Sequence, residues 1–158
     1  MATVGRVGEL VHCIVEGGVA TITLDSPGNR NALSRQLVTE LNAALDRAEQ
    51  PDVRALVLTH TAPVFCSGAD LKERASGTHA AQAAGTPMAD AMARLGSMNA
   101  VTIAAVDGPV RPGGVGLMAA SDLIVVRTTV PFAFTAVRIG VHPAIIRLPL
   151  PARLGCSH

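Results

Sequence analysis

Two short segments near the N-terminus alternate apolar residues with other residues. Every second residue is apolar over residues 11–15 and again over residues 20–24, and Gly17-Gly18 lies between the two segments. A period of two places successive side chains on opposite faces of a strand. Glycine accepts the positive φ angles of a tight hairpin turn. The pattern therefore predicts a β-hairpin.

The next apolar residues recur at helical spacing. They are Leu37, Val38, Leu41, Ala44, Leu45 and Ala48. Ser34 precedes them, and its hydroxyl can accept a hydrogen bond from a free backbone N–H group of the first turn. Pro51 follows them, and proline cannot continue a helix. We expect a helix that begins near Ser34 and ends before Pro51.

Strand and helix patterns then alternate along the chain. Continuous apolar runs predict three strands, over residues 55–58, 101–106 and 123–126. Apolar spacing indicates a helix over residues 88–95, and the pair Gly113-Gly114 leads into a short apolar helix. The small residues from Gly77 to Gly85 resemble a surface loop. This order predicts a layered α/β fold in one domain, with a largely parallel sheet.

The composition is typical of a folded domain, and it argues against nucleic-acid and membrane partners. Of the 158 residues, 49% are hydrophobic and 16% are charged, which suffices for a sizeable core. A net charge of +1 and 2% of aromatic residues provide neither a basic surface nor a stacking platform for nucleic acid. No apolar run approaches the roughly 20 residues of a membrane span. We expect a cytoplasmic protein with no nucleic-acid or membrane partner.

The cysteines indicate no cross-link and no metal. Cys13, Cys66 and Cys156 are odd in number and lack C-x-x-C spacing, so neither a disulfide framework nor a zinc site is expected. Cys66 has no evident base partner and is expected to be a small packed residue.

Two segments combine small residues with a change from strand to helix. They are residues 66–71, Cys-Ser-Gly-Ala-Asp-Leu, and residues 108–116. Such a loop can leave backbone N–H groups free, and the dipole of the following helix favours negative charge. Two converging donors could stabilise an enolate or a tetrahedral oxyanion. The same residues also fit two ordinary tight turns.

Four ordered motifs carry a family resemblance over about residues 11–148. They are Ile22-Thr-Leu-Asp-Ser-Pro27 with Asn31-Ala-Leu-Ser34, Phe65-Cys-Ser-Gly-Ala-Asp-Leu71, Ala105-Val-Asp-Gly-Pro-Val-Arg-Pro-Gly-Gly114 with Ala120-Ser-Asp-Leu123, and Phe132-Ala-Phe-Thr with Arg138-Ile-Gly-Val-His-Pro143. Together they resemble the crotonase superfamily, the enoyl-CoA hydratase/isomerase family. The resemblance implies an α/β, crotonase-like ββα spiral fold that binds acyl-CoA thioesters of fatty-acid and acyl-CoA metabolism.

The C-terminal residues depart from this resemblance. Residues 1–148 are expected to form a crotonase-like core domain, and residues 149–158 an aberrant tail. Pro149 and Pro151 interrupt a region that is helical in the family. We therefore expect a fold truncated before the C-terminal helical region.

The resemblance also implies where the site lies. Ala69 and Gly113 would donate their backbone N–H groups to the thioester oxygen. The residues implied along coenzyme A are Arg30, Ala32, Ser67, Asp70, Leu71 and Lys72. Arg30 and Lys72 fit solvated surface cations equally well. Coenzyme A would arrive as part of the substrate, so no separate cofactor is expected. The family forms trimers or dimers of trimers, which implies a homo-oligomer.

Hydratases of this family divide proton transfer between two glutamates, and this chain has neither. Their positions hold Gly116 and Ala136, and residues 123–158 contain no carboxylate at all. A positioned acid or base contributes about 10²–10⁴-fold to a rate. We therefore expect hydratase activity to be weak or lost, while the acyl-CoA thioester still binds.

A few side chains stay open as substitute acids or bases, each beside a structural interpretation. Asp70 is expected to cap the next helix, Asp122 to accept structural hydrogen bonds, and His60 to be a solvated loop histidine. His142 lies in a segment expected to approach the site. Isomerase-type enolate chemistry using Asp70, His60 or His142 is one alternative function. A non-catalytic subunit or scaffold of an oligomer is the other.

Overall fold

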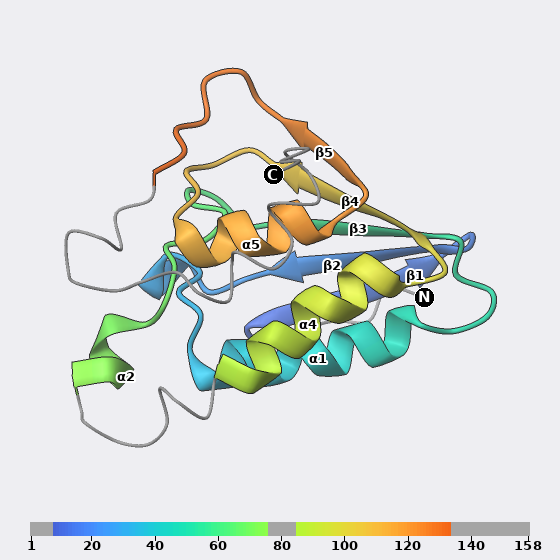
Figure 1. The fold of residues 1–158 in the computed structure, drawn as a ribbon, viewed down its shortest axis with the longest axis horizontal. Coiled ribbons are helices and arrows are strands. Elements are labelled where there is room, and N and C mark those ends of the chain that lie inside the picture. The colour runs from blue at the N-terminus through green and yellow to red at the C-terminus, as the bar shows by residue number, and fades with distance from the viewer. Residues whose placement is uncertain (1–7, 76–84, 134–158) are drawn as a thin grey trace, which may run out of the picture.

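A mostly parallel sheet forms the framework of the chain, whose computed structural model describes residues 8–75 and 85–133. Over these residues the strands lie in the order β1-β2-β3-β4-β5 (Figure 1). They are β1 Val11–Glu16, β2 Val19–Leu24, β3 Ala55–His60, β4 Val101–Val106 and β5 Leu123–Val126. β1 is antiparallel to β2, and every later pair is parallel. The carboxyl ends of β2 to β5 therefore meet at one edge of the sheet, and the loops that follow them come together there.

The predicted hairpin is confirmed. Gly17 and Gly18 have φ angles of 57° and 80°, and Glu16 pairs with Val19 across the turn. Two consecutive positive φ angles define a turn whose twist matches that of the flanking strands. This explains why two glycines join β1 to β2.

The helix predicted after Ser34 is also confirmed. Helix α1 spans Arg35–Ala48, and the Ser34 hydroxyl accepts a hydrogen bond from the backbone N–H of Leu37 at 3.2 Å. All six residues of its predicted apolar stripe are buried. The cap satisfies one of the free N–H groups of the first turn, and the stripe sets which side of the helix meets the sheet.

The longer helices cover one face of the sheet. Figure 1 shows α1, α4 and α5 along this face. Their bounds, with those of the short elements, are η1 Pro27–Asn29, α1 Arg35–Ala48, α2 Leu71–Ala75, α4 Gly85–Ser97 and α5 Pro112–Ala120. Ile22, Leu56 and Ala104 point from the strands into the core, where each is fully buried. The layered α/β expectation and all three later strands are confirmed.

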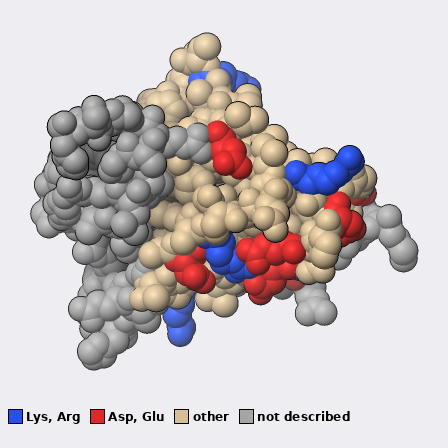
Figure 2. All heavy atoms as spheres, turned by 45° about the vertical axis from the view of Figure 1, so that its right-hand side comes forward, with Lys and Arg blue, Asp and Glu red and all other residues tan. Residues whose placement is uncertain are grey.

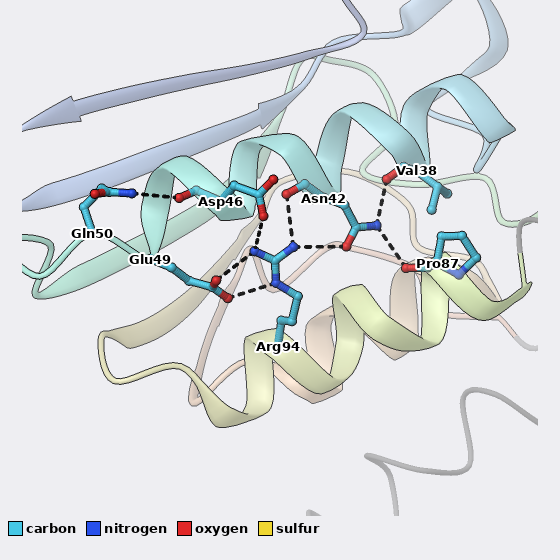
Figure 3. A network of polar contacts seen from close by, with 7 residues as sticks. All are labelled: Val38, Asn42, Asp46, Glu49, Gln50, Pro87 and Arg94. Atoms are coloured by element: carbon cyan, nitrogen blue, oxygen red, sulfur yellow. Dashed lines mark hydrogen bonds and ion pairs between the residues drawn. The ribbon is translucent and has the colours of Figure 1, made fainter.

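A cluster of polar contacts joins α1 to α4 (Figure 3). The Arg94 guanidinium of α4 donates to both carboxylate oxygens of Glu49 at 2.9 Å and to Asp46 at 2.7 Å. It also donates to the backbone carbonyl of Asn42 at 3.2 Å, while the Asn42 amide donates to the carbonyl of Pro87. The Glu49 hydrogen bond, more than any other contact, raises the pKa of Arg94. The cation therefore stays charged and holds the two helices in register.

The face of the molecule drawn in Figure 2 shows no broad area of one charge among the side chains that it colours. Basic and acidic side chains lie beside one another on this face. None of the described helices is long and apolar enough to cross a membrane.

Strand β5 differs from the other strands in exposure. Its four residues, Leu123, Ile124, Val125 and Val126, are all exposed, although each is apolar. The surface loop expected from Gly77 to Gly85 lies outside the described residues, apart from Gly85 at the start of α4. The expected boundary at residue 148 also lies outside them and stays a prediction.

Candidate functional site

The two loops expected to form a site run side by side at the carboxyl edge of the sheet. Cys66 forms a parallel bridge with Val110, and Leu33 forms one with Ala69. The backbone N–H of Arg111 donates to the Cys66 carbonyl at 2.9 Å, and the N–H of Leu33 donates to the Gly68 carbonyl at 2.8 Å. These bonds fix the first loop, residues 66–71, between the segment before α1 and the second loop, residues 108–116.

Cys66 lies at the contact between the loops. Its side chain is fully buried, and its Sγ accepts hydrogen bonds from the backbone N–H groups of Gly68, at 3.4 Å, and Gly114. Burial raises the pKa of the Cys66 thiol to about 12, although the two N–H groups act in the opposite direction. The neutral thiol is therefore no nucleophile near neutral pH. The expectation of a small packed residue is confirmed.

Glycines allow the second loop to approach the first. A Cβ placed on Gly113 would overlap the Leu33 Cδ1 and lie 3.5 Å from the Gly68 Cα. A Cβ on Gly114 would lie 2.6 Å from the Cβ of Cys66 and 3.0 Å from the Val110 Cγ1. The start of α5 thus packs its backbone directly against the first loop.

The two predicted donors, Ala69 and Gly113, both lie at this contact. Gly113 is the second residue of α5, after Pro112, and N–H groups of a first turn have no partner within the helix. The bridge of Leu33 to Ala69 is made through the Gly68 carbonyl and does not involve the N–H of Ala69. Helix α5 adds the positive end of its dipole on the same side. The arrangement can place two donors and a partial positive charge near one oxygen.

Asp70, one residue further, has a structural role. Its Oδ1 accepts from the backbone N–H groups of Lys72 at 2.9 Å and Glu73 at 3.3 Å. These are N–H groups at the start of α2, so the expected helix cap is confirmed. The carboxylate is already committed to this cap, which weakens its candidacy as a base.

The residues expected along coenzyme A gather around the first loop. Ser67 donates its backbone N–H to the Arg30 carbonyl at 3.1 Å and its hydroxyl to the Asn29 carbonyl at 3.2 Å. The side chain of Arg30 is exposed and that of Ala32 is buried. Leu71 and Lys72 are exposed on α2, directly after the loop. The structure thus brings these positions onto neighbouring segments, and their contact with coenzyme A stays a prediction.

The sequence interpretation missed Asn31 as a residue that shapes the site. Asn31 is fully buried with a φ angle of 53°. Its Oδ1 accepts from the N–H of Ser26 at 2.7 Å, and its Nδ2 donates to the Val64 carbonyl at 2.8 Å. Asparagine tolerates positive φ better than most residues. Its place at the start of the Asn31-Ala-Leu-Ser34 motif was the available signal.

Of the two positions at which the family's glutamates are expected to be missing, the structure describes only one. Gly116 is buried in α5, three residues after Gly113 and therefore on the same side of the helix. Ala136 lies outside the described residues. At position 116 a glycine backbone thus lies beside the proposed donor, with no group that transfers a proton.

The remaining candidate acids and bases are Asp122, His60 and His142. Asp122 accepts from the N–H and the hydroxyl of Thr102 at 2.8 and 2.9 Å, so its structural role is confirmed. The solvated loop histidine expected at His60 is wrong, because His60 ends β3, is half-buried and accepts a hydrogen bond from Asp107, just before the second loop. His142 lies outside the described residues. The described residues contain no cluster of side chains that could hold a metal ion.

Substitutions at two glycines should separate close packing from an ordinary helix position. We expect Gly114→Ala to lower the free energy of unfolding by about 1–3 kcal/mol, because its Cβ would collide with Cys66. The matched control is Gly96→Ala in α4, where the nearest atom would be 3.6 Å away. That change should be neutral or stabilise the fold by up to about 1 kcal/mol. Urea unfolding measures both, and equal effects would contradict the packing described here.

Three comparisons with known proteins match this arrangement. The family model of enoyl-CoA hydratase/isomerase matches residues 15–158. A Mycobacterium tuberculosis protein named probable enoyl-CoA hydratase EchA14 is 35% identical over 131 residues, which cover 82% of this chain and 51% of that protein. Enoyl-CoA isomerase/hydratase fer4 of Mycosarcoma maydis is 32% identical over 137 residues, which cover 80% of this chain and 50% of that protein.

Solved structures agree with the sequence comparisons. An enoyl-CoA hydratase of Mycobacterium smegmatis has a TM-score of 0.84 and 31% identity, and the match covers 90% of this chain and 57% of that one. An enoyl-CoA hydratase of Mycobacterium avium has a TM-score of 0.78 and 42% identity, with the same coverage. The chain spans about half the length of the curated relatives it matches.

Proposed function

Because this chain belongs to the enoyl-CoA hydratase/isomerase family, we propose that it binds acyl-CoA thioesters at the two loops and has lost most or all hydratase turnover. The observation that carries the proposal is the packing of the two loops against each other at the N-terminus of α5, beside a glycine at position 116. This packing supports a pair of backbone donors at the loops, while position 116 has no group that transfers a proton.

The chemistry of binding follows from the N–H groups. A thioester oxygen between the N–H groups of Ala69 and Gly113 would accept two hydrogen bonds. These bonds strengthen as negative charge develops on the oxygen, which is how such a site favours an enolate over a thioester. Arg30 and Lys72, both exposed near the first loop, could meet the phosphates of coenzyme A. Ser67 and Leu71 would lie against its adenine end.

Turnover requires more than this polarisation. Hydration adds the hydroxyl group of a water molecule to one carbon and a proton to its neighbour, and both steps need a positioned acid or base. Gly116 supplies none. Asp70 is occupied as a helix cap, and the His60 ring is hydrogen-bonded at both nitrogens. These contacts favour binding over the alternative of isomerase-type chemistry with one of these two side chains.

Binding and turnover can be measured separately. We expect calorimetry to show a higher affinity for butyryl-CoA than for free coenzyme A. Only the thioester has the carbonyl that would meet Ala69 and Gly113. Crotonyl-CoA hydration, followed by the loss of enoyl absorbance, should run at least about 10²-fold below that of a full family enzyme assayed in parallel. Hydration within tenfold of that enzyme would refute the loss of activity. Equal affinity for thioester and free coenzyme A would refute the oxyanion site.

A further inference from the structure

His60 lies where the two loops leave the sheet. It is the last residue of β3, the middle strand of the described sheet, and its ring reaches the segment that follows β4. The backbone N–H of Asp107, the first residue after β4, donates to His60 Nε2 at 3.1 Å. The ring therefore links the strand that precedes the first loop to the residue that precedes the second.

The hydrogen bonds fix the protonation state of this ring. A backbone N–H can only donate, so Nε2 must accept and carries no proton. Nδ1 lies 3.0 Å from the Thr61 carbonyl, which can only accept, so Nδ1 carries the proton and donates. His60 is thus the neutral tautomer with its proton on Nδ1, as assigned from its partners. A doubly protonated ring would present a donor to the Asp107 N–H.

The ring is also packed between the loops. It meets the fully buried Phe65 edge to face, with centroids 5.3 Å apart and planes at 85°. A Cβ on Gly108 would lie 3.0 Å from the His60 Cε1. A Cβ on Gly114 would lie 3.3 Å from the Phe65 Cδ1. A contact chain thus runs from His60 to both ends of the second loop, and little space is left for either to shift independently.

We propose that His60 is a positioning residue, whose neutral ring holds the second loop against the first and so sets the spacing of the Gly113 and Ala69 donors. This rests on the proposed function of those donors. Because the ring must accept at Nε2, protonation of His60 breaks the bond to Asp107 and loosens the site. Acyl-CoA affinity therefore falls once the ring is protonated.

The charged groups on the neighbouring elements are themselves paired. Beyond β2, the Asp25 carboxylate bonds to His12 at 2.8 Å and to the Thr61 hydroxyl at 2.9 Å. Beyond β4, the Asp107 carboxylate pairs with Arg127, the residue that follows β5. Hydrogen bonds from His12 and Thr61 lower the pKa of Asp25. The Asp25 carboxylate therefore stays ionised to a lower pH than an ordinary aspartate.

Two substitutions at His60 separate the loss of the hydrogen-bond acceptor from the change in protonation of the ring. In His60→Gln the amide oxygen can still accept from Asp107 N–H but does not titrate, whereas His60→Ala has no acceptor. Butyryl-CoA affinity is measured by calorimetry from about pH 8 to about pH 5.5. We expect the parent chain to lose about tenfold over this range, His60→Gln to lose little, and His60→Ala to bind about tenfold more weakly throughout. His12→Gln, at a second histidine among the described residues of this sheet edge, should keep the parent's pH dependence.

A ligand-free measurement keeps this test separate from the proposed function. Backbone ¹H–¹⁵N spectra should show the Asp107, Gly108 and Gly113 resonances shifting with pH in the parent chain and staying constant in His60→Gln. If no variant binds butyryl-CoA, the proposed function fails while these shifts still support the positioning role. The role is overturned if the resonances titrate equally in both chains, or if His60→Ala binds as the parent does with the same pH dependence.

Discussion

Gly116→Glu combined with Ala136→Glu should raise crotonyl-CoA hydration by about 10²-fold or more over the parent chain. Each carboxylate restores a proton carrier worth up to about 10²–10⁴-fold. Gly116 lies on the same side of α5 as Gly113, so a side chain there starts beside the proposed oxyanion donor. Its burial would raise the pKa of the new carboxyl group, which suits a general acid. We expect the lower end of the range, because a misplacement of about 1 Å can cost 10²-fold.

The control for this gain has a side chain of similar volume at position 116 that cannot transfer a proton. Gly116→Gln in the Ala136→Glu background has nearly the same shape as the glutamate variant and cannot transfer a proton at neutral pH. Hydration rates of the two variants are compared after circular dichroism and urea unfolding have shown that both fold. If the glutamine variant gains as much as the glutamate variant, the gain comes from packing, and the assignment of position 116 to proton transfer is wrong.

Elements with a regular local pattern could be predicted from the sequence. The Gly17-Gly18 turn, the Ser34 cap and the stripe of α1 each depend on residues close together in the chain, and all are confirmed. The end of β3 shows the limit. The apolar run stops at Leu58, yet the strand continues through Thr59 and His60, because backbone pairing with β2 does not depend on side-chain polarity.

For the candidate site, the sequence predicts where the loops lie but not the contacts between them. Parallel strands place their carboxyl ends at one edge, so the loops after β3 and β4 could be expected to meet there. The contacts that bring them within packing distance could not be expected, because they join residues far apart in sequence. Cys66 against Gly114 and His60 against Asp107 are such pairs. The sequence alone therefore predicts a solvated loop residue at His60, because its partner Asp107 lies 47 positions away along the chain.

Gly113→Pro should remove one of the two proposed oxyanion donors and largely abolish the chemistry that depends on it. Proline has no N–H, and at the second position of α5 the helix does not use that group. Loss of one such donor costs about 10²–10³-fold in turnover. We expect this loss in the Gly116→Glu, Ala136→Glu background. In the parent chain, the infrared carbonyl band of a ¹³C-labelled thioester should return towards its frequency in water.

The matched control for this loss is Gly113→Ala, which keeps the N–H and adds a Cβ. That Cβ meets the terminal Cδ1 of Leu33, a methyl group that can move by a change of rotamer. The alanine variant should therefore keep the shifted carbonyl band and most of the turnover, with only a modest loss of affinity. If alanine and proline weaken the site equally, the space at Gly113 matters and its N–H does not. If proline leaves the carbonyl band unchanged, the thioester oxygen does not bind at Gly113, and the donor pair proposed here is wrong.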